Sequence, residues 1–229
     1  MNVLKQYLFS LGYDQSTTDK AIEKFELYRS FLLEKNELFN LTAITDPHEI
    51  VSKHFIDSLA ALKFMNGEVM DVGSGAGFPA VPLAVLSPNC SFTMVDSLKK
   101  RVEFLTSLFS VLNLNNCTAI HSRAEDLPKN KFYDVVVARA VSELNTLAEY
   151  CIPFVKVGGF FIAYKANDCS DEVKRAKNAV SILGGEICDI EDFKVYSTDI
   201  VRKLIIIKKI KPSPNKFPRG QNKPKKQPL

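Results

Sequence analysis

The chain has 229 residues, of which 46% are hydrophobic and 24% charged, enough for one substantial core or one domain with an appendage. No apolar run reaches membrane-spanning length, and the start Met1-Asn2-Val3-Leu4-Lys5 lacks the basic-then-apolar pattern of a signal peptide. We therefore expect a cytoplasmic protein with no membrane partner. The five cysteines are scattered without C-x-x-C spacing and no histidine forms a metal-type pair, so we expect neither a disulfide framework nor a metal.

The net charge of +4 is distributed unevenly along the chain. Residues 1–199 hold 20 Lys/Arg and 26 Asp/Glu, whereas the last thirty residues hold ten Lys/Arg and no acid. This asymmetry predicts an acidic body with a basic arm for a polyanion, and a solvated, disordered tail is the common alternative. Five of the eleven prolines stiffen the tail, and Phe217 beside Arg219 is a potential base-stacking pair.

Helical patterns fill residues 1–66, which we expect to form an N-terminal helical cap on the core. Residues 15–38 predict an amphipathic helix. Its apolar face holds Ile22, Phe25, Tyr28 and Leu32. Asp46-Pro47 is typical of an N-cap followed by proline at the first helical position, and it predicts a second helix that runs towards Phe64.

Residues 67–210 alternate between strand and helix patterns, which predicts an α/β core with a parallel sheet covered on both faces. The expected strands are 68–73, 91–96, 117–122, 133–138 and 159–165, and the expected helices are 78–87, 98–113, 142–156 and 170–183. Segments 187–196 and 199–210 are rich in β-branched residues and predict an antiparallel pair that closes one edge. Residues 211–229 then form the basic, Pro-rich tail of a single compact domain.

The strongest functional signal is the segment Val69-Met70-Asp71-Val72-Gly73-Ser74-Gly75-Ala76-Gly77-Phe78-Pro79. An apolar strand runs into three glycines at alternate positions, and glycine lets the backbone take positive φ and lie against a ligand. Phe78 occupies the place of the last glycine in the dinucleotide fingerprint G-x-G-x-x-G. The spacing G-x-G-x-G therefore favours S-adenosylmethionine, which has no pyrophosphate. A plain strand-to-helix connection is the alternative for this loop alone.

Two acids strengthen the ligand interpretation. Asp96 ends the next strand, at the distance where a nucleoside-binding fold places a carboxylate to accept both ribose hydroxyls. Asp71 is a second acid and is suited to a cationic amino group.

Ligands in an open α/β sheet bind beyond the carboxyl ends of the strands, which directs attention to residues at those ends. Ala124-Glu125 follows the third strand, where an amide and a carboxylate can read the edge of adenine, although an exposed loop acid is the alternative. Arg139 ends the fourth strand inside an apolar run, and we expect a ligand contact there rather than an interior salt bridge. Arg123 and Lys165 lie at the same ends of their strands.

Motifs spread over almost the whole chain resemble one bacterial family. They are Asn40-Leu41-Thr42-Ala43-Ile44, His54-Phe55-Ile56-Asp57-Ser58-Leu59, the loop Asp71 to Phe78, Arg123-Ala124-Glu125, Ala138-Arg139-Ala140-Val141, Lys216-Phe217-Pro218-Arg219 and the final Pro228-Leu229. Through them the chain resembles the bacterial rRNA small-subunit methyltransferase G family, also called glucose-inhibited division protein B. Ala80 and Asn222 stand where that family usually has glycine, and Phe217 stands where it usually has tyrosine. These are mild changes, and Asn tolerates left-handed φ better than most residues.

The resemblance implies a Rossmann-like class I S-adenosylmethionine-dependent methyltransferase, with a seven-stranded, mostly parallel sheet and an antiparallel terminal strand. It implies methyl transfer from S-adenosyl-L-methionine, leaving S-adenosyl-L-homocysteine, to nitrogen-7 of a guanine in the decoding-region stem-loop of 16S rRNA. The partner would be 16S rRNA in the small ribosomal subunit or its precursor, and we expect a monomer because this substrate is so large.

The expected site combines the family's positions with those argued from the residues. The positions that match the family's cofactor contacts are Gly73, Phe78, Ala124, Glu125 and Arg139, and the residue patterns add Asp71, Gly75, Gly77 and Asp96. The expected RNA contacts are Arg123, Lys165, Lys216, Phe217 and Arg219.

The residues fit this chemistry independently of the resemblance. Guanine nitrogen-7 carries a free lone pair, so attack on a sulfonium methyl needs alignment but no general base, and no base is obvious here. The D/N-P-P-Y/F/W run of amino-group methyltransferases is missing, and no cysteine lies convincingly in a strand-end loop, as a carbon-5 pyrimidine enzyme requires.

Other functions stay open at the level of the sequence. One is a methyltransferase of the same fold that acts on a small molecule or a protein, and another is a non-catalytic ribosome- or RNA-binding module. A nicotinamide oxidoreductase is disfavoured, because the glycine spacing is wrong and no acid–base pair is apparent.

Overall fold

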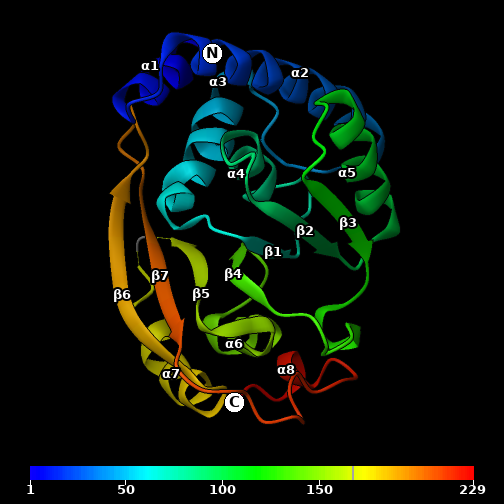
Figure 1. Ribbon diagram of the computed structural model, residues 1–229, viewed down its shortest axis with the longest axis vertical. Helices are drawn as coiled ribbons and strands as arrows, with labels where there is room; N and C mark the ends of the chain where they lie inside the picture. Colours follow the sequence, from blue (N-terminus) through cyan, green and yellow to red (C-terminus); the bar gives the residue numbers. More distant parts are fainter. Residues whose placement is uncertain (167) are drawn as a thin grey trace.

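The computed structural model describes residues 1–166 and 168–229 and shows a central sheet covered by helices on both faces (Figure 1). Within the described residues the sheet has seven strands in the order β3-β2-β1-β4-β5-β7-β6. Strand β7 runs antiparallel to its neighbours β5 and β6, while the pairs among β1 to β5 are parallel. The strands are β1 (Glu68–Val72), β2 (Ser91–Asp96), β3 (Cys117–His121), β4 (Tyr133–Arg139), β5 (Val155–Ala166), β6 (Gly185–Lys194) and β7 (Val201–Lys209). The predicted mostly parallel α/β fold is confirmed.

The central strands are apolar along their length because both of their faces are buried. In β4, Val135 and Val137 pack into one apolar cluster, whereas Val136 packs into a second cluster on the opposite face. The first face is covered by α2 (Gln15–Phe39), α4 (Ala80–Leu86) and α5 (Lys99–Val111), and the second by α6 (Leu144–Cys151) and α7 (Ser170–Ile182).

One predicted helix is too long. The segment 142–156 is helical only in α6, after which η4 (Ile152–Phe154) forms a single 3-10 turn and β5 begins at Val155. Pro153 accounts for the early end, because proline has no backbone N–H and its ring clashes with the preceding helical turn.

The N-terminal cap contains one more helix than the sequence pattern predicted. Helix α1 (Asn2–Ser10) buries Leu4 and Leu8 in the same cluster as α2. Asp14 is the N-cap of helix α2, and its carboxylate accepts the Thr17 backbone N–H at 2.8 Å. Asn40 caps the other end of the helix in a left-handed conformation.

The predicted second cap helix exists as a chain of three helical types. It consists of α3 (Pro47–Ile50), the π-helix η1 (Val51–Ile56) and the 3-10 helix η2 (Leu59–Phe64). The Asp46 carboxylate accepts the backbone N–H groups of His48 and Glu49, both at 2.9 Å, so the predicted N-cap is present. Wide π turns are frequent at functional sites, and this one carries His54.

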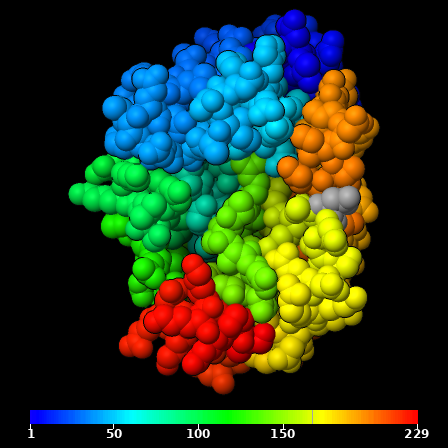
Figure 2. Space-filling model, turned by 180° about the vertical axis from the view of Figure 1, so that it is seen from behind, coloured from blue at the N-terminus to red at the C-terminus, as the bar shows by residue number. Residues whose placement is uncertain are grey.

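Residues 211–229 fold back along the core and end in the short helix α8 (Lys223–Lys226), which contacts α6. Figure 2 shows this C-terminal segment, in red, as a compact layer against the green and yellow parts of the surface. Among the residues described, no helix combines the length and apolar character needed to cross a membrane.

Candidate functional site

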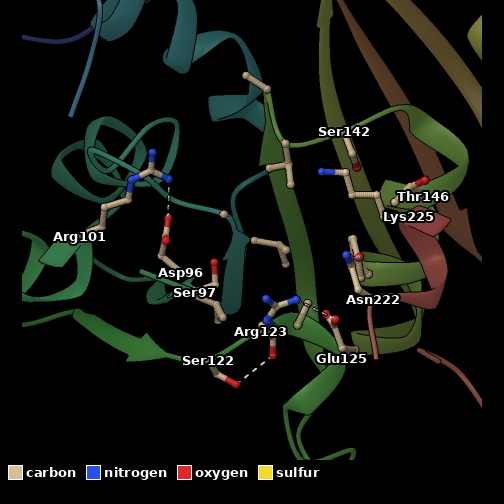
Figure 3. A pocket seen from close by; sticks show the side chains of 17 residues that line it. Asp96, Ser97, Arg101, Ser122, Arg123, Glu125, Ser142, Thr146, Asn222 and Lys225 are labelled. Carbon is tan, nitrogen blue, oxygen red and sulfur yellow. Dashed lines mark hydrogen bonds and ion pairs between the residues drawn. The ribbon is translucent and has the colours of Figure 1, made fainter. Parts of the chain in front are cut away.

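A pocket of about 390 Å³ opens at the carboxyl ends of β1 to β4 (Figure 3). The strand order reverses between β1 and β4, which is where open α/β sheets bind their ligands. The pocket is lined by Val72, Gly73, Val95, Asp96, Ser97, Arg101, Ser122, Arg123, Ala124, Glu125, Ala140, Val141, Ser142, Thr146, Tyr150, Asn222 and Lys225. Four strand ends, helix α6 and the C-terminal segment therefore share one cavity.

Gly73 brings the backbone to the floor of this pocket. Its φ is +76°, and a Cβ at this position would lie 2.6 Å from Cγ2 of Val141, closer than real Cβ contacts. The N–H groups of Gly73 and Ser74 both donate to the Val95 carbonyl, at 2.8 and 3.2 Å, which fastens the loop to the end of β2.

The other two glycines of the motif do not line the pocket. The N–H of Gly75 donates to Oδ2 of Asp96 at 2.9 Å, so this residue holds the loop against β2. Gly77 has a φ of +97°, and a Cβ there would lie 2.7 Å from Val81 and 2.8 Å from the Tyr28 hydroxyl. Gly77 thus permits close packing of the loop against the cap.

Asp96 lies at the end of β2 with its carboxylate facing the pocket. Besides the Gly75 N–H, it accepts the Leu98 N–H at 2.9 Å on Oδ1, and Arg101 Nη1 lies 3.4 Å from Oδ2. A carboxylate has about four acceptor positions, so these contacts leave capacity for a ligand hydroxyl.

Ala124 and Glu125 lie in η3 (Ala124–Asp126), directly after β3, and both line the pocket. The Glu125 side chain is only 5% exposed, and its nearest cation is Nη1 of Arg123 at 3.8 Å. Within the described part of the chain, Oε1 of Glu125 has no hydrogen-bond partner. A buried acceptor without a donor is costly, which makes this oxygen a candidate for a ligand N–H. Arg123 itself is 57% exposed at the mouth.

Asp71 lies beneath the glycine loop and outside the lining of the pocket. It is buried, and neither carboxylate oxygen has a hydrogen-bond partner among the described residues. Burial raises the pKa of this carboxyl to about 8. Such a group gains most from a cation placed next to it.

Arg139 ends β4 but points into the cap. Its Nη1 donates to Oδ2 of Asp57 at 2.6 Å and to the Lys53 carbonyl at 3.3 Å, and its guanidinium lies 5.2 Å from the centre of the Phe78 ring. The interior salt bridge that the sequence left as the alternative is therefore present. Phe78 is buried in the same place, stacked on His54 at 4.4 Å, and its side chain does not line the pocket.

His54 connects Arg139 to Thr42, in the segment that follows helix α2. Its Nδ1 lies 3.2 Å from Nη2 of Arg139 and must accept, because a guanidinium only donates. The other ring nitrogen then carries the proton and donates to Oγ1 of Thr42 at 2.8 Å. This arrangement requires a neutral ring. Burial, and secondly the Arg139 charge, lower the pKa of His54 to about 4.

Lys165 is also engaged inside the protein. Its Nζ donates to the Ser142 carbonyl at 2.8 Å and to Glu172, and its side chain is only 11% exposed. Lys165 does not line the pocket, but it positions the loop after β4, which does.

The three tail residues singled out from the sequence, Lys216, Phe217 and Arg219, do not line the pocket. The Phe217 ring is buried in the second apolar cluster, with Lys216 Nζ 5.2 Å from its centre, so the ring packs in the core instead of lying open for a base. The Arg219 guanidinium donates two hydrogen bonds to the fully buried carboxylate of Glu149, at 2.8 and 2.6 Å.

Several lining residues were not anticipated. Thr146 of α6, with Asn222 and Lys225 of the tail, lies on the side of the cavity away from Asp96 in Figure 3. Tyr150 of α6 also lines the cavity. The strand-end rule identifies the loops after β1 to β4, but no pattern in the sequence indicates that a Pro-rich basic tail returns to that edge.

Comparison with solved structures identifies the class of fold. The TYW2 protein of M. jannaschii in complex with AdoMet superposes with a TM-score of 0.55 at 20% identity, covering 68% of this chain and 76% of that one. NSun6 from Pyrococcus horikoshii with SFG gives 0.56 at 12% identity, covering 68% and 51%. At this identity the likeness concerns the fold alone. The fold is that of class I S-adenosylmethionine-dependent methyltransferases.

Sequence comparison narrows the class to a family. The profile of the GidB family, described as rRNA small subunit methyltransferase G, matches residues 21–201. The Ribosomal RNA small subunit methyltransferase G of Alkaliphilus metalliredigens is 41% identical over 99% of this chain and 98% of its own length. The protein of the same name from Acetivibrio thermocellus is 45% identical over 95% and 93%. The chain belongs to the rRNA small subunit methyltransferase G family and is a methyltransferase, as the motifs in its sequence indicated.

Proposed function

We propose that this protein transfers the methyl group of S-adenosylmethionine to nitrogen-7 of a guanine in the decoding-region stem-loop of 16S rRNA. The observation that carries the proposal is the strand-end pocket, in which Gly73, Asp96 and Glu125 meet at the reversal of strand order. Membership of the family, whose relatives are named for the small-subunit RNA, supports the substrate.

The pocket residues fit the cofactor. Asp96 retains acceptor capacity for a ribose hydroxyl, and the orphaned Oε1 of Glu125 can accept from the exocyclic amine of adenine beside Ala124. Gly73 leaves room for the backbone to approach the methionine part, and the unpaired Asp71 beneath the loop becomes negatively charged when the ammonium group binds. When bound, the cofactor supplies an electrophilic methyl group on a sulfonium.

The remaining residues of the expected site hold the glycine loop and the end of β4 in place. Phe78, Gly75 and Gly77 set the path of the glycine loop, and Arg139 ties the end of β4 to the cap. These roles keep the loop and β4 at a fixed distance, which matters because methyl transfer to a free lone pair depends on in-line alignment. Guanine nitrogen-7 carries no proton, so the reaction needs no general base.

RNA approaches at the mouth of the pocket in this proposal. Arg123 is the exposed arginine there, whereas Lys165, Phe217 and Arg219 act indirectly, by holding the loops and tail that border the mouth. Lys216 remains exposed for a backbone phosphate. We further propose that the protein works as a monomer in the cytoplasm, where the small subunit or its precursor is available.

Transfer of label tests the substrate class. The purified protein would be incubated with tritiated S-adenosylmethionine and small ribosomal subunits that lack the modification, and separately with protein and small-molecule fractions. Label in the RNA of the subunit is the expected result. Label confined to protein or small molecules would keep the methyltransferase pocket but reject the RNA substrate.

A further inference from the structure

The C-terminal segment provides a cation to the pocket. Lys225, in α8, is exposed and lines the cavity next to Asn222. Figure 3 shows these two side chains on the side of the cavity away from Asp96, and the Lys225 side chain extends into the cavity. The sequence pattern predicted a basic arm for this stretch but gave no sign that the arm lies at the pocket.

The segment is fixed in this position by buried contacts. The Arg219 backbone N–H and guanidinium both donate to Glu149, which is fully buried on α6. Further along, the Thr146 hydroxyl donates to the Pro224 carbonyl at 3.1 Å, and the Tyr150 hydroxyl donates to the Asn222 side chain at 3.3 Å. Contacts on both sides of Asn222 thus hold α8 against α6, and Lys225 is presented at a defined place.

The charges around the pocket leave Lys225 without a counter-ion. Arg101 lies 3.4 Å from Asp96, and Arg123 lies 3.8 Å from Glu125, so the two lining arginines face the two lining carboxylates. Considering residues 1–166 and 168–229, Lys225 takes part in no ion pair and no side-chain hydrogen bond. An exposed ammonium group at the rim of a cavity is therefore available to an anion.

We infer that Lys225 binds a backbone phosphate of the RNA substrate at the mouth of the cofactor pocket. Lys225 lies in the half of the cavity away from Asp96, where Figure 3 shows Ser142, Thr146 and Asn222 beside it. The cofactor carboxylate belongs to the other half, near the β1 loop, which leaves the phosphate as the anion that fits. This inference rests on the proposed RNA substrate.

Substitution of Lys225 tests the contact against a neighbour of equal charge. Lys225→Ala should weaken binding to small-subunit RNA and lower the slope of log K against log salt by about 0.7 to 1, the value for one lost phosphate contact. Lys226→Ala removes the same charge from the same helix but does not line the pocket, so it should change both quantities less. Lys225→Arg should restore affinity.

Calorimetry with S-adenosylmethionine alone separates the two sources of an anion. Unchanged cofactor affinity in Lys225→Ala, together with weakened RNA binding, supports the inference. Equal behaviour of the Lys225 and Lys226 variants would overturn it, as would a loss of cofactor affinity with RNA affinity kept. Wild-type methylation of the RNA reports separately on the proposed function, whose failure would appear as no label and no RNA binding in any variant.

Discussion

Two pocket carboxylates differ in what they already bind. Asp96 accepts two backbone N–H groups and so shapes the glycine loop as well as facing the cavity, whereas Oε1 of Glu125 has no donor within the described residues. A ligand therefore adds to the contacts of Asp96 but satisfies those of Glu125 for the first time. An unmade buried hydrogen bond costs about 1–3 kcal/mol, so of these two carboxylates Glu125 gains more from a ligand that donates a hydrogen bond.

Replacement of Asp96 should weaken cofactor binding. Hydrogen bonds to charged groups contribute about 1.5–3 kcal/mol, so Asp96→Ala should raise the Kd for S-adenosylmethionine roughly 10- to 100-fold in calorimetry. Asp126→Ala is the control, because this acid follows Glu125 but is exposed and does not line the pocket. An unchanged Kd in Asp96→Ala would show that the ribose assignment is wrong.

Protonation of Asp71 predicts a proton linked to cofactor binding. With a pKa raised by burial to about 8, this carboxyl is mostly protonated at pH 7. A cation bound beside it favours the ionised form, so binding should release up to about one proton at pH 7 and strengthen as the pH rises towards 8. Calorimetry in buffers of different ionisation enthalpy measures this release, which Asp71→Asn should abolish. A binding enthalpy independent of the buffer would contradict the assignment of the ammonium group to Asp71.

At the scale of elements, the predictable parts are those with a repeating pattern. An apolar run as short as Val135 to Ala138 is typical of a strand buried on both faces, and the strand ends then fix the positions of Asp96 and Glu125. The sequence pattern did not predict helix α1 or the docked tail, and the reasons differ. The first is short, and the second is held by tertiary contacts of single residues, notably Phe217 and Arg219, that leave no periodic signal.

The direction of the Arg139 side chain is another feature that local sequence patterns do not specify. Its place at the end of β4 follows from the pattern, but the carboxylate that pairs with it, Asp57, comes from the cap. A contact between segments 82 residues apart depends on how the cap packs, which local spacing does not specify.

The contact of His54, in the cap, with Arg139 of β4 predicts that the stability of the protein depends on pH. The folded pKa of His54, about 4, lies below its ordinary value of 6.5, so the unfolded chain takes up a proton that the folded one does not. Stability from this group is fully present above pH 6.5 and falls as the pH drops towards 4, by up to about 3 kcal/mol. His54→Gln cannot titrate, so the difference in free energy of unfolding between it and the wild type should shrink from pH 7 to pH 4.5.

Chemical denaturation at the two pH values measures that difference. His48→Gln, at an exposed position of the same cap segment, should follow the wild type. If the free energy of unfolding changed with pH in the same way for the wild type and His54→Gln, the pKa of His54 would not be lowered in the folded protein.

The docked tail depends on the buried pair of Arg219 and Glu149. Removing Arg219 alone leaves a buried carboxylate without its partner, so Arg219→Ala should lower the free energy of unfolding by about 3 kcal/mol. Combining it with Glu149→Gln removes the charge and should recover part of the loss. Arg175→Ala breaks an exposed pair with Glu143 at 3.5 Å and should cost less than about 1 kcal/mol.

Denaturation curves give the stabilities, and limited proteolysis reports whether residues 211–229 come free. If Arg219→Ala matched Arg175→Ala in both measurements, the pair would not be what holds the tail. In a chain with the tail released, Lys225→Ala should no longer add to the loss of RNA binding, because Lys225 is then not held at the pocket.

For the whole molecule, the two ends of the chain serve one site from opposite sides. The cap holds the glycine loop and β4 through Gly77 and Arg139, while the tail completes the pocket wall with Asn222 and Lys225. Of the ten basic residues in the last thirty, Lys225 lines the cavity and Arg219 is paired inside the protein. Four others, Arg202, Lys203, Lys208 and Lys209, belong to strand β7. Deleting the tail would remove a wall of the pocket along with its charge, so point variants separate the two effects better than truncation.

The most direct test of the central claim is to map the methylated nucleotide. Small subunits lacking the modification would be incubated with the wild-type protein and S-adenosylmethionine, and the 16S rRNA would then be cleaved chemically at 7-methylguanine. We predict a single cleavage site in the decoding-region stem-loop, which Asp96→Ala should weaken at limiting S-adenosylmethionine. Cleavage at other guanines, or labelled RNA that is not cleaved by this chemistry, would contradict methylation of nitrogen-7 at that site.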